Sequence, residues 1–292
     1  MFTQQLINGI TVGGIYALIA LGYTMVYGIL KIVNFAHGDV FMVGSFLGLL
    51  FVQNAGMPIY IAYPAAMLVT AAVGVVIERV CYRPIRIKGT DALSILIAAL
   101  GVSIFLENFA QLVWGTGTHA YVQEIKEKNY EFGNINLSNI QIGVIVLCVL
   151  LMAALYFVVN KTKIGVAMRA TSQSITSAQL MGINTEMVIA ATFGVGSALA
   201  CVAGVLVGTY YDAVYPLVGY SYGLKAFAAA ILGGIGSIPG AMLGGFLIGI
   251  VETLGSAYIS AGYKDAFAFG ILILVLIIRP SGLLGKKHVD KV

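Results

Sequence analysis

The chain has 292 residues, of which 60% are hydrophobic and only 10% charged, and its formal net charge is +4. Soluble domains carry about 25% charged residues, so this composition excludes a water-soluble enzyme, and it equally excludes a disordered chain. No dense basic stripe is present, which argues against a nucleic-acid partner. The sequence predicts an all-α, polytopic integral membrane protein.

The first predicted transmembrane helix covers residues 6–30, which carry no charged side chain. About 20 residues cross a bilayer, and the basic segment that opens a signal peptide is missing, so we interpret this stretch as a retained helix. Polar residues follow it at a helix break, and we consider them candidates for a gate of the translocation path near the inner mouth: Asn34, His37 and Asp39. The alternative is that they bond to neighbouring helices and hold this turn in shape.

The uncharged stretch 40–77 is too long for one crossing, and Pro58 and Pro64 lie where a turn would divide it. We therefore predict helices near 39–54 and 60–78. The next predicted span lies near 92–113.

The span near 92–113 contains Glu107 beside Asn108 and four residues before Gln111, so the three polar residues could share one helix face. An ionisable residue inside a span is costly and raises a functional hypothesis. Glu107 is either a residue of the translocation path or part of a polar knot that bonds to a neighbouring helix.

Later spans are predicted near 140–160, 187–210, 217–235, 241–258 and 263–279, which gives about eight or nine crossings. The stretch 213–263 is interrupted by Lys225, Glu252 and many glycines, so a broken or re-entrant segment is expected there. Glu252 is expected to pair with a residue of another helix.

Basic residues concentrate in segments 79–90 and 161–186 and in the C-terminal tail, which together hold eleven of the sixteen Lys and Arg residues. Short cytoplasmic loops collect Lys and Arg, so we place these three regions inside. The loop 115–139, with Glu124, Glu127 and Glu131 against Lys126 and Lys128, then lies outside, as does the N-terminus. Glu78 and Arg79 are expected to form an interfacial pair.

Segment 161–186 is long enough for a short helix along the inner surface, which is what a permease uses to dock on a motor. Ala178 and Leu180-Met181 would offer a small apolar knob, and Gly182 a helix stop. We take the candidate coupling residues to be Arg169, Ser177, Ala178, Leu180 and Gly182. An ordinary amphipathic surface loop is the alternative.

Glycines mark two further features. Gly44/Gly48, Gly204/Gly208, Gly240/Gly244 and Gly245/Gly249 are spaced four apart, which predicts close helix packing. The cluster around a proline predicts either a hinge or a compact turn at Gly233, Gly234, Gly236 and Pro239.

Motifs for enzymatic chemistry are missing from the sequence. Gly285-Lys286-Lys287 lacks the upstream Gly and the hydroxyl residue of a phosphate loop, and none of His37, His119 and His288 lies in H-E-x-x-H. The three cysteines, Cys81, Cys148 and Cys201, are far apart. We expect no catalytic residues, no metal site and no cofactor.

Four ordered segments nevertheless match a known family: Asn34 to Asp39, Glu78-Arg79 with Tyr82 to Arg86, Arg169 to Asn184, and Gly223 to Gly240. With them the chain resembles, over nearly its whole length, the permease subunit of bacterial branched-chain amino-acid ABC importers, the smaller of their two permeases. Importers of this class place a cytoplasmic E-A-A-x-x-x-G loop on their ATPase. Ala178 and Gly182 match it, whereas Thr176 and Ser177 replace its first two residues.

The resemblance implies a single multi-pass domain in the bacterial inner membrane that carries leucine, isoleucine or valine, while separate subunits hydrolyse ATP. The implied partners are a second related permease, two ABC ATPase subunits, an external substrate-binding protein and the lipid bilayer. An ABC permease for urea, short amides or other amino acids is the alternative within the class. An ion-coupled secondary transporter or channel is the alternative outside it.

Overall fold

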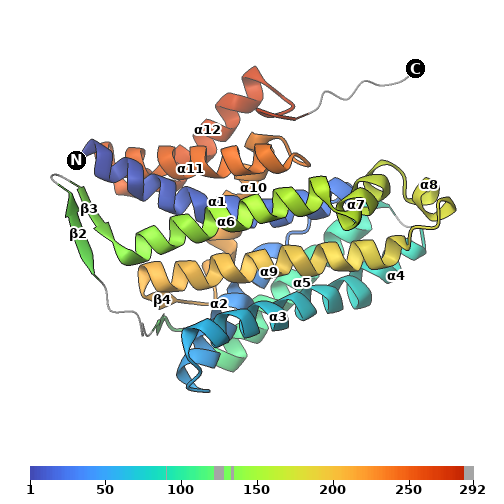
Figure 1. The fold of residues 1–292 in the computed structure, drawn as a ribbon, viewed down its shortest axis with the longest axis horizontal. Coiled ribbons are helices and arrows are strands. Elements are labelled where there is room, and N and C mark those ends of the chain that lie inside the picture. The colour runs from blue at the N-terminus through green and yellow to red at the C-terminus, as the bar shows by residue number, and fades with distance from the viewer. Residues whose placement is uncertain (90, 122–127, 133–134, 286–292) are drawn as a thin grey trace.

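The computed structural model describes residues 1–89, 91–121, 128–132 and 135–285, and the chain folds into an elongated helical bundle (Figure 1). The α-helices are α1 (Phe2–Leu30), α2 (His37–Gln53), α3 (Ile59–Ile77), α4 (Arg83–Ile87), α5 (Ala92–Trp114), α6 (Asn139–Lys161), α7 (Lys163–Gln173), α8 (Ile175–Leu180), α9 (Thr185–Tyr211), α10 (Val218–Gly233), α11 (Ile238–Tyr258) and α12 (Lys264–Ile278). A π-helix (Glu78–Tyr82) joins α3 to α4, and a 3-10 turn (Ala261–Tyr263) precedes α12.

Sheet structure is confined to two short antiparallel pairs within the described residues. β1 (His119–Ala120) pairs with β4 (Ala213–Val214), and β2 (Asn129–Phe132) pairs with β3 (Ile135–Ser138). The predicted all-α membrane fold is therefore confirmed.

Seven helical stretches of the described chain are long and apolar enough to cross a membrane: Phe2–Leu30, Ile59–Ile87, Leu93–Trp114, Asn139–Lys161, Thr185–Tyr211, Ile238–Tyr258 and Ala261–Ile278. The predicted count of eight or nine is reached only by adding α2 and α10, which have 17 and 16 residues.

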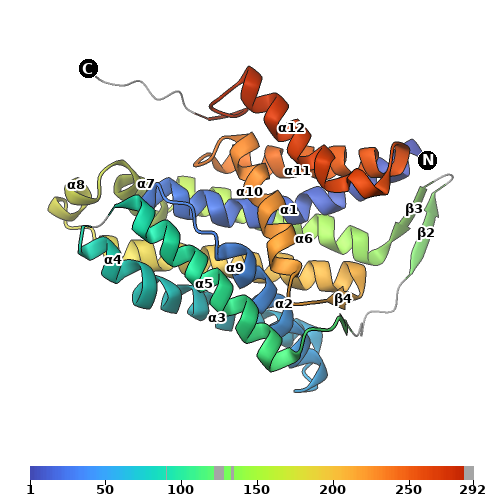
Figure 2. The same ribbon diagram turned by 180° about the vertical axis from the view of Figure 1, so that it is seen from behind.

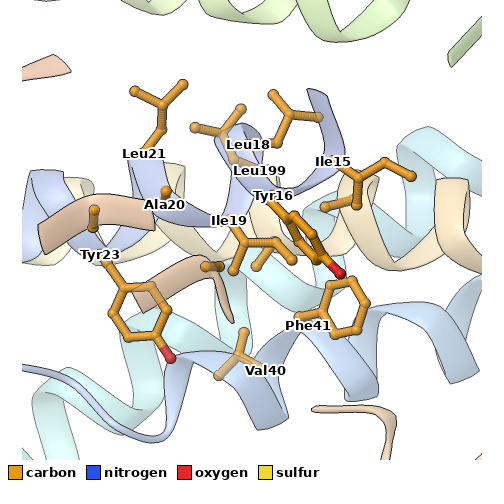
Figure 3. Packing of buried hydrophobic residues seen from close by; sticks show 14 of the residues in the cluster. Ile15, Tyr16, Leu18, Ile19, Ala20, Leu21, Tyr23, Val40, Phe41 and Leu199 are labelled. Atoms are coloured by element: carbon orange, nitrogen blue, oxygen red, sulfur yellow. The ribbon is translucent and has the colours of Figure 1, made fainter. Parts of the chain in front are cut away.

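Helix α1 forms the centre of the bundle and is buried along almost its whole length. Figure 3 shows Tyr16 and Ile19 of α1 directed toward Phe41 and Val40 of α2. On another face, α1 touches α11 backbone to backbone: a Cβ on Gly249 would lie 2.3 Å from the Cα of Gly13. Only glycine permits this approach.

The other predicted glycine pairs also lie at helix contacts. A Cβ on Gly44 would lie 2.6 Å from the Cα of Cys201, which joins α2 to α9. A Cβ on Gly244 would lie 2.0 Å from the carbonyl oxygen of Ala229, which joins α11 to α10. The packing interpretation of these spacings is confirmed.

Helix α2 begins in the interior of the bundle rather than at its surface. His37, its first residue, lies against Gly22 of α1, which is eight residues before α1 ends at Leu30. At 1.5 Å per residue, the chain between the two helices turns back by about 12 Å into the bundle. This re-entrant stretch explains why α2 is short.

Helix α10 begins at the same level. A Cβ on its Gly219 would lie 2.6 Å from the carbonyl oxygen of Gly38, so the first turns of α2 and α10 touch. The break expected within 213–263 therefore lies immediately before α10. Figure 2 shows α10 crossing the bundle obliquely between α2 and α12.

The two ends of the bundle differ. The N-terminus and the β2–β3 pair lie at one end, where the Gln4 side chain bonds to the backbone of Asn136, and α4, α7 and α8 lie at the other (Figure 1). The segments assigned to opposite sides from their charge thus occupy opposite ends. Part of the predicted charge pattern lies outside the described residues: Glu124, Lys126, Glu127, Lys286, Lys287, His288 and Lys291.

Candidate translocation and coupling site

His37 occupies a notch at the break between α1 and α2. The imidazole is 2% exposed, lies edge-on to the Tyr23 ring with 4.8 Å between centroids, and bonds to the backbone carbonyl of Ile19. A Cβ on Gly22 would lie 2.1 Å from its Nε2. These contacts fix the start of α2 against α1, and they favour the interpretation that His37 holds the turn in shape.

Asn34 lies in the re-entrant stretch and is also buried. Its Oδ1 accepts a hydrogen bond of 2.7 Å from the hydroxyl of Tyr82, which ends the π-helix between α3 and α4. The re-entrant stretch is thereby tied to a second, distant part of the chain.

A row of polar side chains leads outward from Asp39 along α5. Asp39 accepts a hydrogen bond from Ser103, and Glu107, four residues further, interacts electrostatically with Asp39 and accepts a bond of 3.3 Å from Gln111. Ser103, Glu107 and Gln111 share one face of α5 and are all partly exposed.

One expectation for α5 is wrong. Asn108 does not share the face of Glu107; it is exposed and donates to the carbonyl of Ile104 on its own helix. Ser103 takes its place in the polar row, and its spacing four residues before Glu107 is the signal that sequence reasoning overlooked.

Glu252 is the buried centre of an ionic cluster that joins four helices. Its Oε1 lies 2.9 Å from Lys225 of α10, 3.2 Å from Lys264 of α12 and 3.2 Å from the hydroxyl of Tyr16 in α1. Lys225 also reaches Asp265 at 2.6 Å. The expected interhelical pairing of Glu252 is confirmed, and the cluster contains two cations and two carboxylates.

At the other end of the bundle, α7 and α8 form the predicted surface segment. Leu180 and Met181 are 85% and 83% exposed, and Gly182 follows with φ of +82°, which ends the helix as predicted. Ser177 is exposed, and the exposed Arg169 donates to the carbonyl of Val159.

Ala178 does not contribute to the apolar knob as expected. The residue is only 3% exposed, and its backbone carbonyl accepts a bond of 3.0 Å from the N–H of Ile183, in the chain that leads into α9. The exposed apolar residues at the end of α8 are instead Leu180 and Met181, with Met187 of α9 beyond them.

The expected pair between Glu78 and Arg79 is wrong. Glu78 is fully buried and pairs with Arg86 at 3.1 Å, whereas Arg79 is exposed. Arg86 also donates a bond of 2.7 Å to Glu186 of α9, and Arg83 lies 2.9 Å from the same carboxylate. Glu78 continues the buried face of α3 that includes Thr70 and Gly74, so it points into the bundle while Arg79 points out.

The glycine cluster between α10 and α11 has the geometry of a compact turn. Gly234 and Gly236 have φ of +100° and +94°, and Pro239 lies in the first turn of α11. The turn is crowded: Leu284 donates a bond of 2.9 Å to the carbonyl of Gly233, and a Cβ on Gly234 would lie 2.3 Å from the backbone of Gly285. Hinge motion at Gly233, Gly234, Gly236 and Pro239 stays a prediction.

Comparison with known proteins places this geometry in a family. Residues 5–276 match the family described as the permease component of branched-chain amino acid transport systems. The chain belongs to this family. It is a transport component rather than an enzyme, and a multi-pass protein of the inner membrane.

Individual relatives agree over the whole chain. The high-affinity branched-chain amino acid transport system permease BraD of Pseudomonas aeruginosa is 44% identical over 100% of this chain and 98% of its own length. LivH of Escherichia coli, a permease described in the same words, is 43% identical over the same shares. The ribose import permease RbsC of Haemophilus influenzae is 24% identical over 97% of this chain and 87% of its own length.

Proposed function

We propose that this permease works in an ATP-driven ABC importer that carries branched-chain amino acids inward. Separate ATPase subunits hydrolyse ATP, a second permease completes the path, and an external binding protein delivers the substrate. The full-length identity of 44% to BraD and 43% to LivH supports this substrate class over the sugar carried by the more distant RbsC.

The observation that carries the coupling part of the proposal is the exposure of Leu180 and Met181. Large apolar side chains exposed side by side on a short helix at the basic end of a membrane protein fit a protein contact. We assign this surface to an ATPase subunit, with Ser177 and Gly182 beside it and with Ala178 and Arg169 supporting it from within the segment.

The path itself is proposed to follow Asp39, Ser103, Glu107 and Gln111. An amino acid is a zwitterion, so the carboxylate of Glu107 on the partly exposed face of α5 and the buried carboxylate of Asp39 on α2 can attract its ammonium group in turn. The neighbouring exposed side chains of α5, such as Ile104 and Phe105, are apolar and suit a branched side chain. A path that must also release its substrate requires weak, repeated contacts of this kind rather than one tight site.

The test is uptake by the complete transporter, reconstituted in lipid vesicles with its ATPases, second permease and binding protein. The variant Leu180→Asp is expected to lose ATPase docking, substrate-stimulated hydrolysis and uptake of leucine, isoleucine and valine. Val166→Asp, an exposed apolar position of α7 at 55%, serves as the matched control and is expected to keep all three.

Normal stimulated hydrolysis in Leu180→Asp would overturn the docking assignment. Uptake of urea or a short amide, without uptake of branched-chain amino acids, would overturn the substrate assignment. Uptake that follows an ion gradient and needs no ATP would overturn the transporter class.

A further inference from the structure

The coupling segment is tied to the start of α9 by short-range bonds. Gln179 of α8 donates a bond of 2.9 Å to the hydroxyl of Thr185, which is buried at the first position of α9. The next residue, Glu186, carries the carboxylate that Arg83 and Arg86 hold. A displacement of α8 would therefore move the carboxylate of Glu186.

Arg86 links Glu186 to a carboxylate in the interior of the bundle. Its guanidinium is shared between Glu186 at 2.7 Å and Glu78 at 3.1 Å, and the Glu78 side chain is fully buried. A planar guanidinium holds two carboxylates in directions that its rigid fork of N–H groups fixes, whereas the ammonium of a lysine has no such fork. The Glu78 carboxylate lies in the π-helix, one turn before Tyr82.

The π-helix completes the connection to the interior of the membrane. Arg83 donates its backbone N–H to the carbonyl of Glu78, five residues earlier, so this turn holds one residue more than an α-turn. Such turns concentrate at functional sites, and a return to the α-helical register would rotate the residues beyond it. Tyr82 lies inside this turn and bonds to Asn34 at 2.7 Å.

We propose that Glu78, Tyr82 and Arg86 transmit movement of α8 to the re-entrant stretch that begins α2. The inference rests on the proposed function and adds a route between two parts of it, the ATPase contact and the candidate gate at Asn34, His37 and Asp39. Tyr82 and Arg86 are positioning residues: they contact other side chains of the route, not the substrate. Such a route requires an element with two states, and in this proposal they are the observed π-helical register of Glu78–Tyr82 and an α-helical register of the same turn.

Tyr82→Phe is the mildest test, because it removes one hydroxyl and keeps the ring that packs 5.5 Å from Phe193. Tyr60→Phe, on α3 and 78% exposed, is the matched control. The readout is the number of ATP molecules hydrolysed per amino acid taken up by the reconstituted complex. Loss of one hydrogen bond is expected to raise this ratio about tenfold in Tyr82→Phe, with normal yield of the complex and with hydrolysis retained.

Arg86→Met tests the same route by severing both ion pairs, and Arg86→Lys is expected to restore the ratio only in part. Arg79→Met is the control, since Arg79 is exposed on the same helical segment. A wild-type ratio in both Tyr82→Phe and Arg86→Met would overturn the route. A parallel fall of hydrolysis, uptake and complex yield in both would also overturn it, because that pattern indicates a purely structural role.

The unmodified complex separates the two proposals. If it fails to take up branched-chain amino acids with ATP, the proposed function fails, and the inferred route fails with it. If it is active while both variants keep its ratio, only the route fails.

Discussion

Lys225 is the cation that contacts both carboxylates of the ionic cluster around Glu252. Lys225→Met removes the cation that lies 2.9 Å from Glu252 and 2.6 Å from Asp265. The change keeps the length and apolar stem of the side chain but leaves one cation for two carboxylates. Glu252 is fully buried, so its charge cannot be transferred to water.

The expected loss follows from what remains around Glu252. Breaking a buried ion pair costs about 3–5 kcal/mol, because one charge stays behind without compensation. Lys264 at 3.2 Å and the hydroxyl of Tyr16 at 3.2 Å continue to stabilise the carboxylate. We therefore expect the lower end, about 3 kcal/mol of unfolding free energy, or roughly a hundredfold in the unfolding equilibrium.

The assay is thermal unfolding of the purified protein in detergent. Unfolding is monitored by the reactivity of the thiols of Cys148 and Cys201, which are buried in the folded protein. The double variant Lys225→Met/Glu252→Leu removes the buried pair together and leaves only the more exposed Lys264 and Asp265, so it is expected to unfold within about 1 kcal/mol of the unmodified protein. Lys264→Met is a matched control, because this lysine is 41% exposed and its loss should cost less.

Equal stability of Lys225→Met and the unmodified protein would contradict the expected cost of leaving Glu252 without its cation. A double variant less stable than Lys225→Met would contradict it as well, because the buried charge of Glu252 would then not be the cause of the loss.

Three further predictions concern orientation, packing and the candidate gate. In a background without the native cysteines, Asn129→Cys should react with an impermeant thiol reagent in intact cells and Gln173→Cys should not; the reverse pattern would invert the orientation. Gly249→Val places a Cβ 2.3 Å from the backbone of α1 and should lower the free energy of unfolding by about 1–3 kcal/mol. Gly143→Val, where nothing lies within 4 Å of the added Cβ, should leave it unchanged. Equal melting temperatures of the two variants would contradict the contact. If the carboxylate of Asp39 gates the path, Asp39→Asn should alter uptake while the yield of the complex stays normal. Loss of the complex would indicate a structural role. Wild-type uptake with normal yield would show that neither role depends on the charge of Asp39.

Much of the fold could be predicted from the sequence, because membrane insertion depends on one segment at a time. The cost of transferring a segment into lipid is set by its own side chains, so apolar length located the spans, and Pro58 marked the start of α3. Local backbone rules are equally independent of distant residues. The positive φ of Gly182 and the turn that ends at Pro239 follow from glycine and proline alone.

The contacts of the candidate site were decided by tertiary structure. Glu78 pairs with Arg86 rather than with its neighbour Arg79 because it lies on the buried face of α3, whereas Arg79 faces outward. Ala178 is buried because of how α8 packs in the folded chain, and an alanine at the same place in the sequence would equally suit an exposed position.

The start of α2 is the clearest case. Polarity at Asn34, His37 and Asp39 indicated a helix break, and the sequence determined that much. At this break the chain turns back into the bundle, and Gly38 meets Gly219 there. Both features depend on the close packing of three helices around the break. Hydropathy measures each segment against lipid, whereas packing depends on which segments face one another, and only the folded chain determines that.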